Sequence, residues 1–183
     1  MPHYPFEFHQ ADAIDVLGRL VTGTQNDSDD WLAQFDAIAA SPTCQSRARV
    51  TDWRGSRANH PDTLTPTLAL LGQTRIPWVV ENVTEAADIL RPDYLLCGTQ
   101  FGLNVRRHRI FQRGNWTAFE LMPPCQCYRN PRLLPFMHKG ERAFADAMGC
   151  TWMTNDEGRQ AIPPAYTEYI GRQLLEFMTE AAA

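Results

Sequence analysis

Cys44 is the residue most suited to covalent chemistry, because it follows a short apolar run at residues 35–40. That run predicts a buried strand, and Pro42 ends it, since proline cannot continue a central strand. Cys44 is therefore expected in a loop past the carboxyl end of a strand, where open α/β sheets bind their ligands. Arg47 and Arg49 follow, and nearby positive charge favours the nucleophilic thiolate. The alternative is an inert, semi-buried structural cysteine, which is the commoner kind.

Two further stretches favour the nucleophile. Residues 77–83 are an apolar run that ends in a carboxylate, Glu81, followed by Asn82 and Val83. Residues 106–111 are an arginine cluster that runs into another strand. A cysteine loop, then Glu-Asn-Val, then Arg-x-Arg, in this order, resembles the DNA (cytosine-5)-methyltransferase family.

The resemblance covers nearly all of the chain. It is closest to short, phage-type members of the family, through residues 96–103 and 161–167. The residues that look like the nucleophile loop are Pro42-Thr43-Cys44-Gln45, those that look like the glutamate motif are Glu81-Asn82-Val83, and those that look like the arginine motif are Arg107-His108-Arg109. The chain departs from the pattern at Thr43, where the family has proline, and at Val105, where glutamine is usual.

The resemblance implies methyl transfer to carbon 5 of a cytosine that is flipped out of duplex DNA. Carbon 5 is too weakly nucleophilic to react unaided, and a thiolate that adds at carbon 6 activates it. Cys44 would be this nucleophile. Glu81, partly protonated through burial, would stabilise the charge at the ring nitrogen. Arg109 and Arg107 would hold the base oxygen and support the thiolate.

The cofactor implied by the resemblance is S-adenosyl-L-methionine, with Asp12, Pro42 and Ile162 as contacts. Asp12 would accept a hydrogen bond from the adenine amino group, and it also suits the N-cap of a helix that begins at Ala13. The family's glycine-rich strand–turn–helix and its ribose-binding acid are not found before Asp12. We therefore expect a partial or split enzyme, truncated at its N-terminus, that binds the cofactor weakly on its own.

A catalytically inactive remnant that binds DNA or a partner protein is the alternative function, and an inert start-codon artefact of a longer gene is a third. In the family's sheet, the strands not found here lie between the strands expected at residues 6–12 and 35–40. The strand at 35–40 is therefore expected to have an open apolar edge. A second chain or a second copy could cover such an edge.

Charge is distributed unevenly along the chain, although the net charge is only −4. Residues 1–40 carry seven acids against one base, whereas residues 100–142 carry eight bases against two acids. A basic half of this kind is typical of proteins that bind a phosphate backbone, so DNA is the expected partner. Chance clustering on a solvated surface is the alternative. The residues expected to contact DNA are Arg47, Arg49, Arg106, Arg129 and Arg132.

A proline-rich, basic stretch at residues 113–147 is expected to be a small target-recognition region. Pro124-Cys125-Gln126 also matches the nucleophile motif, but no apolar strand precedes it and it follows the arginine motif, so we exclude it. Cys125 and Cys127 could bind zinc with His138 and Cys150. Their spacing fits no standard zinc module, and no metal is predicted.

The predicted elements alternate along the chain. Strands are expected at residues 6–12, 35–40, 76–83, 94–98 and 109–111, and helices at 13–20, 65–71, 84–90, 141–148 and 165–178. This alternation predicts an α/β fold with a mainly parallel sheet. The resemblance narrows it to a truncated, Rossmann-like class I methyltransferase sheet. The expected domains are 1–112 (catalytic), 113–147 (target recognition) and 148–183, a segment that returns to the catalytic domain.

Composition fits a folded protein, since 44% of the residues are hydrophobic and 10% aromatic. No apolar run is long enough to cross a membrane, and residues 1–5 do not look like a signal peptide. The five cysteines do not form a secreted disulfide pattern. The expected location is the cytoplasm of a bacterial host, with the gene carried by a phage.

Overall fold

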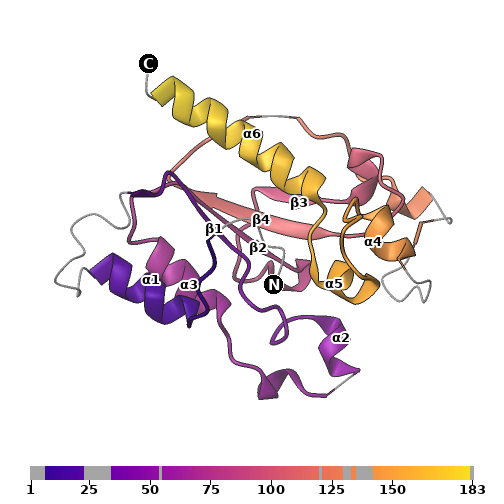
Figure 1. The fold of residues 1–183 in the computed structure, drawn as a ribbon, viewed down its shortest axis with the longest axis horizontal. Coiled ribbons are helices and arrows are strands. Elements are labelled where there is room, and N and C mark those ends of the chain that lie inside the picture. Colours follow the sequence, from indigo (N-terminus) through magenta and orange to yellow (C-terminus); the bar gives the residue numbers. More distant parts are fainter. Residues whose placement is uncertain are drawn as a thin grey trace.

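Mixed α/β architecture is seen in the computed structural model, which describes residues 7–22, 34–53, 55–119, 121–129, 133–134 and 142–181. Four strands form one sheet within these ranges: β1 Ile38–Ala40, β2 Trp78–Asn82, β3 Tyr94–Leu96 and β4 Arg109–Gly114. Their order across the sheet is β1-β2-β4-β3. Figure 1 shows the sheet lying between α6 on one side and α1 with α3 on the other.

Six α-helices and several single 3-10 turns surround the sheet in the described residues. The helices are α1 Ala13–Thr22, α2 Arg49–Asp52, α3 Leu64–Leu71, α4 Ala143–Ala147, α5 Asn155–Gln160 and α6 Pro164–Ala181. The 3-10 turns are η2 Arg57–Asn59, η3 Thr84–Ala86, η4 Gly98–Phe101 and η5 Cys127–Arg129. The expected helix starting at Ala13 is confirmed. Its N-cap is Asp12, whose Oδ1 accepts hydrogen bonds from the backbone N–H groups of Ile14 and Asp15.

The sheet is mixed, so the prediction of a mainly parallel sheet is wrong. β1 and β2 are parallel, with Ile38 opposite Trp78, whereas β4 is antiparallel to both β2 and β3. The reason lies between β3 and β4, which are joined by a connection without an α-helix. Parallel neighbours need a long crossover, usually helical, whereas antiparallel neighbours do not.

The two faces of the sheet are buried by different helices, and residues along β2 alternate between them. Trp78, Val80 and Ile110 point to the first face and pack against Leu64 and Leu71 of α3. On the second face, Leu96 and Phe111 pack against Tyr166, Tyr169 and Ile170 of α6. The sequence predicts an apolar side on the closing helix at Tyr169, Ile170, Leu174 and Phe177, and all four pack in this cluster, so the prediction is confirmed. This apolar side attaches the end of the chain to the sheet.

Several local predictions fail. The strand at 6–12 is not formed, since residues 7–12 are exposed and outside any strand, and residue 6 lies outside the described ranges. Alternating polarity stabilises a strand only when a neighbouring strand supplies the ladder hydrogen bonds. The strand at 35–40 is reduced to β1. α2 and η2 lie in a stretch that shows no helical period, and α5 was not predicted.

β1 is an edge strand in the described part of the chain, because β2 is its only partner there. Phe35, just before it, is 44% exposed. The open edge expected from the sequence is therefore present among these residues. The three domain ranges remain predictions.

Candidate active site

Cys44 lies in the loop after β1, and neighbouring elements hold this loop in place. The buried side chain of Asn82, at the end of β2, donates a hydrogen bond of 3.0 Å to the Pro42 carbonyl. The Thr43 hydroxyl lies 2.9 Å from that of Thr63, which precedes α3. Cys44 itself is half-buried and carries a free thiol. The proline break and the parallel strands together bring this thiol to the carboxyl end of β2.

Glu81 lies largely shielded from solvent near the end of β2 and forms an ion pair with Arg109. Arg109 Nε lies 2.7 Å from Glu81 Oε1, and the two side chains are 15% and 12% exposed. Glu81 pairs with Phe111 across the sheet, so Arg109 is its diagonal neighbour. Burial raises the pKa of Glu81, although Arg109, a hydrogen bond with Ser41 and the charge of Arg107 all oppose this rise.

Arg107 is buried and anchored by the segment that leads into α6. Its Nη2 donates hydrogen bonds of 2.6 and 2.8 Å to the carbonyls of Arg159 and Ala161. The Tyr166 hydroxyl donates to the Arg107 carbonyl at 2.6 Å. The end of the chain therefore fixes one half of the arginine motif, which the sequence could not show because these partners are more than fifty residues away.

The four predicted catalytic residues share one electrostatic neighbourhood. Burial lowers the pKa of Arg107 to about 9, and the like charge of Arg109 acts in the same direction. Glu81 and the sulfur of Cys44 oppose this shift, so both lie close enough to Arg107 to influence it. The arrangement offers a thiol after β1, a carboxyl group with a raised pKa near the end of β2, and two cations at the start of the antiparallel strand β4.

The three residues expected to bind the cofactor are not gathered in the same way. Asp12 is exposed at the start of α1, a helix whose Leu17 packs against the first face of the sheet. Ile162 packs within the cluster on the second face. Pro42 lies in the loop that carries Cys44, and Ile162 follows Ala161, whose carbonyl accepts a hydrogen bond from Arg107. These three residues do not by themselves make a site for S-adenosylmethionine.

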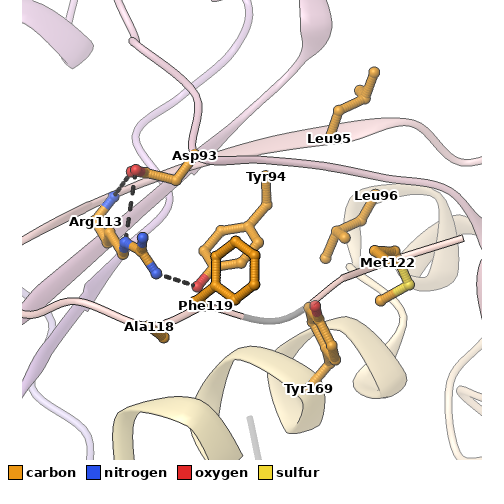
Figure 2. A pocket seen from close by; sticks show the side chains of 9 residues that line it. All are labelled: Asp93, Tyr94, Leu95, Leu96, Arg113, Ala118, Phe119, Met122 and Tyr169. Carbon is orange, nitrogen blue, oxygen red and sulfur yellow. Dashed lines mark hydrogen bonds and ion pairs between the residues drawn. The ribbon is translucent and has the colours of Figure 1, made fainter. Parts of the chain in front are cut away.

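A separate cavity of about 250 Å³ opens between β3, β4 and α6. Figure 2 shows Arg113 reaching both Asp93 and the Tyr94 hydroxyl, with bonds of 2.8 Å from its backbone N–H and its Nη1 respectively. The Tyr94 hydroxyl in turn donates to Gln173. The polar groups of this cavity are therefore engaged with one another, and the predicted catalytic and cofactor residues do not line it.

The expected DNA-contacting arginines differ in their surroundings. Arg47 lies 3.2 Å from both Asp62 and Asp88, and Arg49 lies 3.4 Å from Glu85. A hydrogen bond from the Thr65 hydroxyl lowers the pKa of Asp62, with further help from Arg47, so Asp62 stays charged. Arg106 is exposed. Arg129 ends η5, where its side chain is not described, and Arg132 lies outside the described residues.

Ser41 and His108 were missed as contributors from the sequence. Ser41 hydrogen-bonds Glu81, and its position just before Pro42 is a signal that could have found it. His108 lies between the two arginines in the sequence. Its imidazole contacts Cys125 and Cys127, and its carbonyl accepts a hydrogen bond of 2.7 Å from Arg109. The rejected nucleophile Cys125 thus belongs to a different cluster. His138 lies outside the described residues.

Comparisons of the chain with family models, with curated proteins and with solved structures give no significant match. Within the described ranges, none of the helices combines the length and the apolar character needed to cross a lipid bilayer. Function must therefore be argued from the site itself.

Proposed function

We propose that this chain carries the base-activating site of a DNA (cytosine-5)-methyltransferase. The observation that carries the proposal is the Glu81–Arg109 pair, 2.7 Å apart and largely shielded from solvent, beside Cys44 and Arg107. Paired carboxylates and arginines are common in protein cores. A pair that lies next to a free thiol in the loop after a parallel strand is far less common. Groups whose pKa is perturbed in this way cluster at functional sites.

The proposed reaction begins when the Cys44 thiolate adds to carbon 6 of a flipped cytosine, with Arg107 as the neighbouring cation. The ring nitrogen takes a proton from Glu81 as electron density moves onto the ring. Arg109 moves its hydrogen bonds from Glu81 to the base oxygen. Because Arg109 lowers the pKa of Glu81, its departure raises that pKa, and the carboxyl group keeps its proton until transfer.

The resulting enamine is nucleophilic at carbon 5, and in the absence of a methyl donor it takes a proton from water. The original carbon 5 hydrogen then leaves as a proton. The carbon–sulfur bond breaks with its electron pair returning to Cys44, and the ring nitrogen returns its proton to Glu81. The net result is exchange of the carbon 5 hydrogen with solvent, which needs only residues of this chain.

Methyl transfer itself needs S-adenosylmethionine, which Asp12, Pro42 and Ile162 do not hold on their own. We propose a split arrangement, in which a second chain or second copy completes the cofactor site. The parallel β1–β2 pair supports the Rossmann-like assignment, because open α/β sheets bind their ligands at the carboxyl ends of such strands.

A DNA-binding or partner-binding remnant is the second candidate. The positions of Asp12 and Ile162 favour it. Asp12 is exposed at the start of α1, whereas Ile162 packs on the second face of the sheet, so the residues expected to bind the cofactor are not gathered into one site. This candidate predicts binding without any chemistry at the base.

The test is release of tritium from duplex DNA of mixed sequence that is labelled at carbon 5 of cytosine. We expect slow release by the wild-type chain without cofactor, and none by Cys44→Ser or Glu81→Gln. A matched control is Glu157→Gln, an exposed glutamate at the start of α5, which should leave release unchanged. DNA binding without release would favour the remnant, and release by Cys44→Ser would contradict the mechanism.

A further inference from the structure

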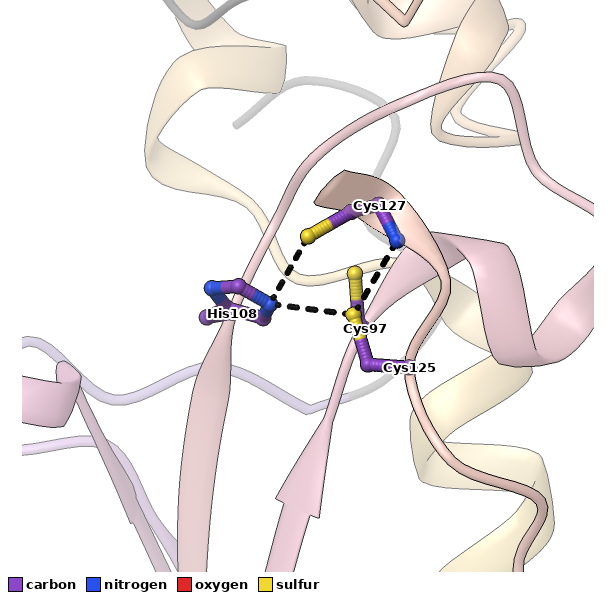
Figure 3. Close-up of side chains that lie close together, drawn as sticks. All are labelled: Cys97, His108, Cys125 and Cys127. Carbon is purple, nitrogen blue, oxygen red and sulfur yellow. Dashed lines mark hydrogen bonds between the residues drawn. The ribbon is translucent and has the colours of Figure 1, made fainter. Parts of the chain in front are cut away.

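Three thiols and one imidazole meet at the end of the β3–β4 pair. Cys97 follows β3, His108 precedes β4, and Cys125 and Cys127 come from the segment at residues 121–129. Figure 3 shows the four side chains pointing toward a common centre. Their donor atoms all lie within 4.8 Å of one another.

The sheet itself brings the first two groups together. Leu96 pairs with Arg109 in the antiparallel β3–β4 ladder, so Cys97 and His108 occupy the next opposing positions. Contacts with η4 hold Cys125 and Cys127 next to Cys97 and His108. Gln100 Nε2 donates to the Pro123 carbonyl at 2.7 Å.

The distances fit a tetrahedral metal centre. His108 Nε2 lies 3.4 Å from Cys125 Sγ and 3.5 Å from Cys127 Sγ. Zinc bonds of about 2.3 Å to sulfur and about 2.0 Å to nitrogen place ligand atoms about 3.5 Å (N···S) and about 3.8 Å (S···S) apart in a tetrahedron. The cluster is therefore close to metal-binding geometry as it stands.

Hydrogen bonding alone accounts poorly for these contacts. A single Nε2 atom has either one N–H or one lone pair, so it cannot satisfy two sulfurs at once. A cation at the centre satisfies all four groups together. Cys97 is fully buried and Cys127 is 6% exposed, and the thiols are free rather than paired in a disulfide.

Neighbouring groups are placed to stabilise thiolate ligands. The Thr99 hydroxyl lies 3.5 Å from Cys97 Sγ and 3.7 Å from Cys125 Sγ. The backbone N–H of Cys127 donates to Cys125 Sγ at 3.4 Å. Such contacts around the ligands are characteristic of metal centres, where they orient the ligand atoms.

We propose that Cys97, His108, Cys125 and Cys127 form a structural zinc site. Four protein ligands leave no open position, which is the pattern of structural and not of catalytic zinc. The set differs from the sequence alternative, because Cys150 packs instead in an apolar cluster with Val105 and Phe144. The earlier expectation of no metal is thereby revised.

A bound zinc ion would hold two parts of the molecule in place, the segment at 121–129 and the backbone around His108. The segment at 121–129 has little apolar anchorage of its own, since Leu121 and Tyr128 are 84% and 69% exposed. A metal would tie this segment to the sheet. His108 stands between Arg107 and Arg109, so its coordination would also hold the backbone that presents both arginines. The zinc proposal does not depend on methyl transfer.

The first measurement is the metal content of the intact chain, refolded with Zn²⁺ and freed of excess metal. We expect one zinc per chain and, on replacement by Co²⁺, the visible bands of tetrahedral cobalt with thiolate charge transfer. Three fewer thiols should react with a thiol reagent in the zinc-loaded chain than after chelation.

Variants then identify the ligands. Cys125→Ser and Cys127→Ser should lose the one-to-one zinc and the cobalt bands, whereas Cys125→His should retain both, because histidine can replace a thiolate ligand. Cys44→Ser is the matched control and should keep its zinc. Cys150→Ala and His138→Ala should also keep it, which separates this site from the sequence alternative.

Since a ligand variant could fail to fold, the wild-type result must stand alone. A wild-type chain that stays metal-free after refolding with Zn²⁺, with all thiols equally reactive with and without the metal, would overturn the proposal. So would a disulfide within the cluster in the freshly purified chain, or full zinc binding by Cys127→Ser.

Discussion

At the residue scale, two features of its surroundings act in opposite directions on the charge of Glu81. Burial favours the neutral acid, whereas Arg109 at 2.7 Å favours the carboxylate. The balance is a raised pKa. Such a group can give up a proton when a base enters and take it back when the base leaves, which is the behaviour of a general acid and base.

The raised pKa predicts how stability depends on pH. The folded chain holds a proton at Glu81 above the ordinary value of 4.5, where the unfolded chain has lost it. The free energy of unfolding should therefore fall as pH rises from 4.5 through the folded pKa, and Glu81→Gln should lack this slope. The measurement is denaturant unfolding across that pH range. Carbon 5 exchange should fail at higher pH, as Glu81 loses its proton.

The control for this pH dependence is Glu157. A hydrogen bond from the Thr154 backbone N–H lowers the pKa of Glu157, so Glu157→Gln should remove a slope of the opposite sign, below pH 4.5. The same pH slope in wild type and in Glu81→Gln would contradict the account of Glu81.

Breaking the Glu81–Arg109 ion pair, which is largely shielded from solvent, should be costly. Arg109→Met leaves Glu81, 12% exposed, without its cation, and removal of one partner from a buried pair costs about 3 kcal/mol of unfolding free energy. The double variant Glu81→Gln/Arg109→Met should recover much of this loss. Denaturant unfolding at pH 7 is the measurement.

Arg142→Met provides the comparison, because the Arg142–Asp146 pair is 55% and 50% exposed. It should change stability by about 0.5 kcal/mol or less. Equal losses for Arg109→Met and Arg142→Met would show that the Glu81–Arg109 pair is not shielded from solvent as described.

At the element scale, the site depends on how closely β4 lies against β2. Gly114 is opposite Trp78 in the ladder, and a Cβ at Gly114 would lie 2.2 Å from the indole ring. Trp78 is 7% exposed and cannot move away freely. The glycine thus lets the tryptophan cover the end of β4.

Gly114→Ala should therefore destabilise the protein by about 1–3 kcal/mol through overpacking. Gly171→Ala is a matched control in the middle of α6, where a Cβ meets nothing within 4 Å. It should stabilise the helix by about 0.5–1 kcal/mol. Thermal unfolding of the two variants would show opposite shifts, and a neutral Gly114→Ala would contradict the packing of Trp78.

Elements with strong local signals could be predicted from the sequence. β2 begins as an apolar run, and α6 carries Tyr169, Ile170, Leu174 and Phe177 at helical spacing, so both were found. The failures involve partners distant in the sequence. Residues 7–12 alternate in polarity without gaining a neighbouring strand, and the direction of β4 depends on a connection that has no periodic signal.

The candidate site could likewise be predicted only in part. Cys44, Glu81, Arg107 and Arg109 were identified by motif and by strand context. The grouping of Cys97 and His108 with Cys125 could not be predicted, because it arises from an antiparallel register that no motif encodes.

At the scale of the whole molecule, the arginines expected to contact DNA differ in whether a carboxylate already lies beside them. This difference predicts which of them contribute most to DNA binding. Arg47 and Arg49 already have carboxylate neighbours, whereas Arg106 is exposed. A paired arginine must give up an ion pair to reach a phosphate, so its contribution to DNA affinity is smaller.

Binding of duplex DNA should therefore respond differently to two matched substitutions. Arg106→Ala should reduce the log–log salt slope by about 0.9, the value for one phosphate contact. Arg47→Ala should change it less. The measurement is DNA affinity by fluorescence anisotropy across a range of salt concentrations. A larger change for Arg47→Ala would mean that its ion pairs open on binding.

The central claim is that Cys44 is the nucleophile, and the most direct measurement is mapping of a covalent DNA adduct. Duplex DNA containing 5-azacytosine is suitable, because its ring accepts a thiolate at carbon 6 without a methyl donor. After digestion of protein and DNA, mass spectrometry identifies the modified peptide. The account predicts the nucleotide on Cys44 and no adduct with Cys44→Ser. An adduct on Cys125, or one that persists in Cys44→Ser, would contradict it.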